Sequence, residues 1–126
     1  METIGKYEVS IFIGSKNEKT KKTFEKQELI ATIQRYQTAS GNDSYLPVRV
    51  TDTSFVAGVD YCEHGFQITA VRLPTRDETE KEVWSWANEL AWHLLISFNQ
   101  RRVGVSDEDH MIYLRDVSPK KVPAWR

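Results

Sequence analysis

Apolar residues recur at helical spacing through residues 75–100, the longest periodic stretch of the chain. Thr75 and Glu78 fit a capping box, in which two side chains bond the first free amides of a helix. Acidic residues follow, where the helix dipole favours negative charge. The stretch therefore predicts a helix about 36 Å long, at 1.5 Å per residue. Its core-facing positions are Val83, Ala87, Leu90, Ala91, Leu94, Leu95 and Phe98.

The first third of the chain predicts one strand and one helix. Residues 7–14 alternate apolar and polar side chains, as in a strand that is packed on one side. A lysine-rich connection, residues 15–22, leads to a helix expected over residues 24–40. Thr23 would cap that helix, and Gly41 would follow its end.

The middle and the end of the chain predict four more strands. Residues 46–61 and 66–73 are expected to pair around a turn at residues 62–65, with a bulge at Gly58. After the long helix, strands are expected at residues 102–105 and 110–115. The last ten residues contain two prolines and are unsuited to a central strand.

The resulting order is strand, helix, strand, strand, helix, strand, with one added strand. This order is typical of ferredoxin-like split β-α-β (βαββαβ) folds of the α+β class, which have an antiparallel sheet with two helices on one face. We expect one domain over residues 1–116 and a C-terminal tail over residues 117–126.

Composition is that of an ordinary globular protein, with 126 residues, 40% hydrophobic and 28% charged. A net charge of −1 gives no global attraction to nucleic acid or membrane. The single cysteine, Cys62, cannot form an internal disulfide and suits a reducing compartment. Without an apolar stretch long enough for a membrane helix, or a signal peptide, the sequence favours a cytoplasmic protein.

The expected topology collects basic residues at one end of the sheet. The lysine-rich loop, the turn at residues 62–65 and the corner at residues 100–102 should meet there. Free amides at a helix N-terminus favour anions, and a guanidinium binds oxyanions through two hydrogen bonds. The sequence thus predicts an anion site, with a solvated basic surface as the alternative. Its residues would be Lys21, Lys22, His64, Arg101 and Arg102.

Metal binding and catalysis have weaker support. Cys62 and His64 form one short Cys-x-His pair, whereas a structural zinc site needs four convergent ligands. His110 should lie at the opposite end of the sheet. No nucleophile, phosphate-loop or dinucleotide motif is present. We therefore assign no metal, no cofactor and no catalytic residue.

Two short segments resemble the signatures of RNA-recognition-motif domains. Residues 11–14, Ile-Phe-Ile-Gly, resemble the first-strand signature, and Gly65, Phe66 and Ile68 resemble part of the third-strand signature. The resemblance implies base stacking on an open sheet face. However, Ile68 replaces an aromatic residue and Phe66 belongs to the expected core set, so this remains the least favoured function and nucleic acid is not an expected partner.

Aromatic residues remain that the core does not use. Trp92 and Ile96 fall outside the apolar arc of the long helix, and Trp125 lies in the tail. Tryptophan is enriched in protein interfaces, which favours a homodimer or higher homo-oligomer. Alternatively, Trp125 folds back over Trp92 and Ile96 within one chain. The other face of the sheet, with Phe12 and Val71, is a second place for a partner or ligand.

The sequence thus favours a homo-oligomeric binding or interaction module that takes a small or anionic ligand. The alternative is a small enzyme whose active site forms between subunits.

Overall fold

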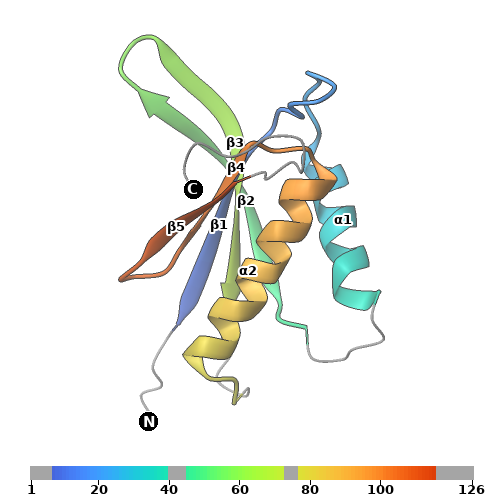
Figure 1. Ribbon diagram of the computed structural model, residues 1–126, viewed down its shortest axis with the longest axis vertical. Helices are drawn as coiled ribbons and strands as arrows, with labels where there is room; N and C mark the ends of the chain where they lie inside the picture. Colours follow the sequence, from blue (N-terminus) through green and yellow to red (C-terminus); the bar gives the residue numbers. More distant parts are fainter. Residues whose placement is uncertain (1–6, 40–44, 73–76, 116–126) are drawn as a thin grey trace.

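A computed structural model describes residues 7–39, 45–72 and 77–115 (Figure 1). Five strands form one antiparallel sheet, and two helices pack on one of its faces. In chain order, the elements are β1 (Glu8–Gly14), α1 (Lys26–Thr38), β2 (Val48–Ala57), β3 (Tyr61–Val71), α2 (Glu80–Ser97), β4 (Arg102–Ser106) and β5 (Met111–Arg115).

The strand order across the sheet is β2-β3-β1-β4-β5. Each neighbouring pair is antiparallel, and β1 lies in the centre between β3 and β4. Ile11 is opposite Ile68 on one side and Val105 on the other, so one face of the three central strands is apolar. The predicted α+β class, antiparallel sheet and paired helices are confirmed.

The core lies between this apolar face and the helices. The inward residues of β1, Val9, Ile11 and Ile13, are almost fully buried. Helix α2 supplies the largest helical share of the core, since six of the seven positions expected from the sequence are buried within it. The seventh, Phe98, is buried just after the helix ends. Phe24, just before α1, stacks on Phe98 with 4.1 Å between ring centroids and closes one end of the core.

Helix α2 starts and ends inside the predicted range. The cap is Thr79, whose hydroxyl accepts from the Glu82 amide at 3.1 Å, while the Glu82 carboxylate accepts from the Thr79 amide at 3.1 Å. The cap thus lies one helical turn after the predicted box of Thr75 and Glu78, of which Thr75 is outside the described residues. The Thr-x-x-Glu pattern occurs twice, four residues apart, and sequence alone does not distinguish the two copies. Asn99, with φ of 49°, follows the end of the helix in the left-handed region.

Helix α1 is also shorter than expected. It begins after Glu25, whose amide donates to the Glu28 carboxylate at 3.4 Å. Thr23 is not the cap, because Glu25 takes that position, and Thr23 forms an isolated β-bridge with Lys16 instead. The residue predicted to follow the helix, Gly41, lies outside the described residues.

The β2–β3 hairpin differs most from the prediction. Its turn is at residues 58–60, where Gly58 has a φ of 68°, a conformation that glycine adopts without strain. Residues 62–65 lie within β3, with Cys62 opposite Val56 and Gly65 opposite Thr53. The hairpin extends beyond the rest of the sheet (upper left in Figure 1), so its outer residues have no helix to pack against. Because the first residues of β3 are mostly exposed, they do not alternate between buried and exposed positions. This strand was therefore predicted to begin at residue 66, whereas it begins at Tyr61.

Candidate functional site on the open face of the sheet

The face of the sheet away from the helices carries a cleft of about 430 Å³, here called the open-face site. Strand register explains its composition, because alternate residues of all five strands point to this side. Phe12 is opposite Gly104, and Gly104 is opposite Tyr113. The lining residues are Phe12, Phe55, Tyr61, Glu63, Arg102, Gly104, Ser106, Met111 and Tyr113.

Three glycines make room for the larger side chains of this face. A Cβ on Gly104 would lie 3.1 Å from the Met111 methyl carbon and 3.4 Å from the Tyr113 ring. A Cβ on Gly65 would collide with the Phe55 ring, and one on Gly14 would collide with the Glu63 carboxylate. The aromatic rings and the carboxylate can therefore lie directly on the backbone of the sheet.

Aromatic rings form the walls of the open-face site. Phe12 and Phe55 meet edge to face, with 6.4 Å between centroids. The Arg102 guanidinium lies 4.9 Å from the centroid of the Tyr113 ring. This contact holds the cation against an aromatic face.

Glu63 supplies the negative charge of the site. The Tyr61 hydroxyl donates a short hydrogen bond to its carboxylate, and this bond raises the pKa of Tyr61. Glu63 and Arg102 also line a second cleft of about 420 Å³, together with Glu18, Gln100, Arg101 and Arg115. The carboxylate and guanidinium therefore stand where the open-face site joins the basic corner of the molecule.

Polar side chains continue the open face beside the aromatic cleft. The Gln67 amide donates to the Ser10 hydroxyl at 3.0 Å, and Ser10 and Thr69 share a hydrogen bond of 3.1 Å. A smaller cleft of about 260 Å³ is lined by Phe12 and Ser106 together with Glu8, Ser10, Asp107 and Glu108. The open face thus offers an aromatic part and a hydrogen-bonding part side by side.

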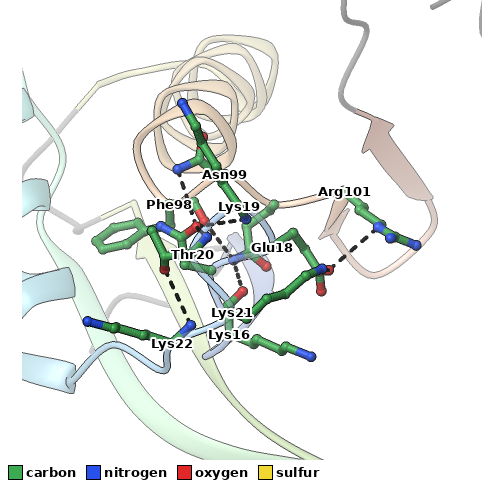
Figure 2. Close-up of polar contacts among 11 residues, drawn as sticks. Lys16, Glu18, Lys19, Thr20, Lys21, Lys22, Phe98, Asn99 and Arg101 are labelled. Atoms are coloured by element: carbon green, nitrogen blue, oxygen red, sulfur yellow. Dashed lines mark hydrogen bonds and ion pairs between the residues drawn. The ribbon is translucent and has the colours of Figure 1, made fainter.

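The predicted anion residues lie at one end of the sheet but face different partners. Glu18 is between Lys21 and Arg101, as Figure 2 shows. Its carboxylate is 3.1 Å from the Lys21 ammonium and 3.5 Å from the Arg101 guanidinium. The hydrogen bond from Lys21 lowers the pKa of Glu18. The loop and the corner therefore meet, with a carboxylate already between their charges.

The other members of that set point elsewhere. Lys22 extends from the opposite side of the loop from Arg101 (Figure 2). His64 is in β3, where its Nε2 is 3.2 Å from Asp52, a carboxylate that Lys26 also contacts at 3.1 Å. Arg102 belongs to the open-face site. The structure brings Lys21 and Arg101 together at Glu18, places Arg102 in the adjoining cleft with Arg101, and gives His64 separate surroundings.

The predicted interface residues are exposed where they are described. Trp92 is 40% exposed and Ile96 is 69% exposed on α2. Trp125 and the rest of the tail lie outside the described residues. Among the described residues, no three His, Cys, Asp or Glu side chains lie close enough together to hold a metal ion. No helix in the described ranges is long and apolar enough to cross a membrane.

The open-face site was only partly foreseen from the sequence. Phe12 was expected on this face and Arg102 was assigned to the basic end. Tyr61, Glu63 and Tyr113 were missed as site residues. Tyr61 and Glu63 were missed because the hairpin turn was expected at residues 62–65, whereas it lies at residues 58–60. Tyr113 was missed because β5, Met-Ile-Tyr-Leu-Arg, shows no alternation of apolar and polar residues. Val71, predicted on the same face, lies opposite Glu8, outside the cleft.

Fold and cleft together define a small α+β protein with a ligand-sized aromatic site on an uncovered sheet. No protein-family model matches the sequence, and neither does any curated protein. Among solved structures, the fold is similar to that of a phage SAM lyase. The likeness holds for its complex with S-methyl-5′-thioadenosine, at 15% identity, and for its apo state, at 16% identity. Each has a TM-score of 0.67, and the alignment covers 92% of this chain and 95% of that chain. At such identity the likeness is one of fold.

Proposed function

We propose that this protein is a small enzyme that binds S-adenosylmethionine at the open-face site and cleaves it. The observation that carries the proposal is the likeness to the phage SAM lyase over nearly the whole of both chains. Fold by itself does not determine function, so the site must also suit the ligand. The proposal takes up the enzyme alternative, and the wider reading of a small-ligand-binding module remains part of it.

The open-face site suits a ligand with a flat base and a positive sulfonium. Aromatic rings such as Phe12 and Phe55 offer apolar faces to a purine. Electron-rich ring faces also attract cations, and the Glu63 carboxylate adds opposite charge. Arg102 can pair with the carboxylate at the amino-acid end of the ligand. These residues support binding through complementary charge as well as shape.

The cleavage chemistry follows from the sulfonium. When the bond between sulfur and the amino-acid side chain breaks, both electrons stay on sulfur, which becomes the neutral thioether of S-methyl-5′-thioadenosine. If water does not attack the carbon that leaves sulfur, the electrons for its new bond must come from elsewhere in the substrate. Either the substrate's own carboxylate attacks this carbon as the C–S bond breaks and closes a lactone ring, or a base takes a proton from the adjacent carbon and the electrons of that C–H bond form a C=C bond. The enzyme can favour either path by holding the substrate in a reactive conformation.

Two finer features belong to the same proposal. We assign the fold to the ferredoxin-like split β-α-β type, which the strand order β2-β3-β1-β4 supports, with β5 as the added edge strand. A reducing, cytoplasmic compartment is supported by the single cysteine, which is exposed.

Incubation with S-adenosylmethionine, followed by chromatographic detection of S-methyl-5′-thioadenosine, tests the function. We expect product to form at a rate above that of the buffer, and Glu63→Gln to lower kcat/KM at least tenfold. Glu80→Gln, the same change at an exposed position at the start of α2, is the matched control and should leave the rate unchanged. Calorimetry separates binding from cleavage. Absence of both binding and product with the unaltered protein would overturn the proposal.

A homo-oligomeric interaction module is the second candidate. The exposed pair Trp92 and Ile96 on α2 favours it, because a contiguous apolar surface of this kind is typical of association sites. The two candidates are compatible, since the helical face and the open face lie on opposite sides of the sheet.

A further inference from the structure

A second cavity lies between the two helices, on the other side of the molecule from the open-face site. It measures about 570 Å³, which is within the range of small-molecule sites. The last turns of α1 form one wall and the middle of α2 forms the other. The lining residues of this helical groove are Arg35, Tyr36, Gln37, Ala39, Tyr45, Trp86, Glu89 and His93.

Aromatic rings dominate the helical groove. Tyr36 stands in its centre, with its ring centroid 6.0 Å from that of Trp86 and 5.0 Å from that of His93. The Tyr36 and Trp86 rings are inclined by 66°, so they present two differently oriented faces to one space. Tyr45, from the segment before β2, adds a fourth aromatic residue and is 42% exposed. Tyr36 and Trp86 are partly buried and pack against the core while they also line the groove.

One carboxylate, Glu89, and one guanidinium, Arg35, line the groove beside these rings. Glu89 lines the groove, and together with burial its charge raises the pKa of Tyr36, so the carboxylate acts on the centre of the aromatic surface. An adjoining cleft shares Trp86 and Glu89 and adds Glu78, Glu82 and Lys81. The two clefts thus hold three carboxylates and two cations. One of those cations, Arg35, donates to the Thr32 hydroxyl at 3.1 Å.

The geometry points to a binding site for an organic cation with a methylated onium group, of the choline type. Such a group is too bulky and too weakly hydrated to need hydrogen bonds, and it is attracted by ring faces through their quadrupoles. Tyr36 and Trp86 supply these faces, and Glu89 supplies the balancing charge. This site is separate from the proposed cleavage site and does not depend on it.

A comparison of two isosteric probes tests this inference on the unaltered protein. Choline and 3,3-dimethylbutan-1-ol have the same shape, but only choline is charged. Titration at constant ionic strength, followed by NMR of the tryptophan indole N–H groups, should shift the Trp86 signal with choline. Trp86→Phe identifies that signal. We expect a choline dissociation constant on the order of 1 mM, and binding at least fivefold weaker for the neutral alcohol.

Glu89→Gln should weaken choline binding about three- to tenfold, whereas Glu108→Gln, the same change at an exposed site in the β4–β5 turn, should not. Equal binding of the alcohol would overturn the inference, because the groove would then be only an apolar cavity. The inference would also be overturned if choline did not shift the Trp86 signal, or if the two glutamine variants lost choline affinity equally.

Discussion

Asp107 shows how one side chain organises the turn between β4 and β5. It accepts from the Tyr7 hydroxyl at 2.8 Å and from the amides of Asp109 and His110 at 2.9 and 2.8 Å. Burial alone would raise the pKa of Asp107, but these hydrogen bonds outweigh it and lower the pKa. Burial and the same bond raise the pKa of Tyr7 far above its ordinary value. The pair joins β1 to a turn 100 residues away in the chain.

Tyr7→Phe should therefore destabilise the protein by about 1 kcal/mol at pH 7, the usual contribution of one hydrogen bond. The pKa of Asp107 is lower in the folded protein than in the unfolded chain, where it is about 3.9. Its contribution to stability is therefore complete above this unfolded-state pKa and is lost as the pH falls through the folded-state pKa. The difference in the free energy of unfolding between the Tyr7→Phe variant and the parent should become smaller below about pH 4. Urea unfolding of both proteins at pH 7 and pH 3 measures this difference. A difference that stays constant with pH would show that Asp107 is not the partner that matters.

Glu18 is the residue that decides how the basic end behaves. Its carboxylate neutralises part of the charge of Lys21 and Arg101, which are the cations that the structure brings together. An anion can bind there only by competing with Glu18. Each exposed contact contributes about 1 kcal/mol or less and is screened by salt.

Glu18→Gln should accordingly increase the rise in melting temperature that sulfate or phosphate causes, and Arg101→Ala with Arg102→Ala should abolish it. Thermal unfolding at low ionic strength, with chloride as the reference salt, provides the measurement. Lys16→Ala is a matched control for loss of one positive charge in the same loop. If phosphate and chloride act alike on the parent and on Glu18→Gln, the predicted anion site does not exist.

At the scale of elements, α2 depends on the capping box at its start. Thr79 and Glu82 bond reciprocally, and Glu80 and Glu82 place negative charge at the positive end of the helix. Thr79→Ala should destabilise the protein by about 1 kcal/mol. Ser85→Ala, at an exposed position inside the same helix, should be neutral or slightly stabilising, because alanine has the higher helix propensity. Chemical denaturation of both variants tests the assignment. Equal effects would mean that the cap lies elsewhere.

The long hairpin is the element that creates the open-face site. Phe55, Tyr61 and Glu63 belong to its outer half, beyond the residues of β3 that pair with β1. A shorter hairpin with its turn at residues 62–65, as the sequence suggested, would remove these side chains from the cleft. The length of the β2–β3 hairpin therefore determines whether this face of the sheet carries a cleft.

At the scale of the whole molecule, Trp92 and Ile96 form an exposed apolar pair on α2 that a partner could cover. We predict that light scattering at micromolar concentration shows a dimer or larger species, and that Trp92→Glu weakens it by placing a charge in the interface. Lys81→Glu, an exposed change on the same helix, is the control for an altered charge. A monomer at all concentrations would contradict the prediction and favour a contact within one chain.

Much of the fold could be predicted because its signals are local. The alternation of Val9, Ile11 and Ile13 and the helical spacing from Val83 to Phe98 depend only on neighbours along the chain. Cap positions and the hairpin turn could not be predicted as well, because two Thr-x-x-Glu patterns and two glycine-containing segments compete locally. The choice depends on which residues have a packing partner.

The sequence by itself determined the order of strands and helices, the inward faces of β1, α2 and the second half of β3, and the meeting of the lysine-rich loop with the corner at Arg101. These follow from periodicity and from the short connections that an antiparallel sheet allows. Only the tertiary structure decided which side chains share a site. Glu63 joins Phe12, Arg102 and Tyr113 through strand pairing, and Tyr36 joins Trp86 through helix packing. Such contacts join residues tens of positions apart, and nothing in the local pattern of either partner specifies the other.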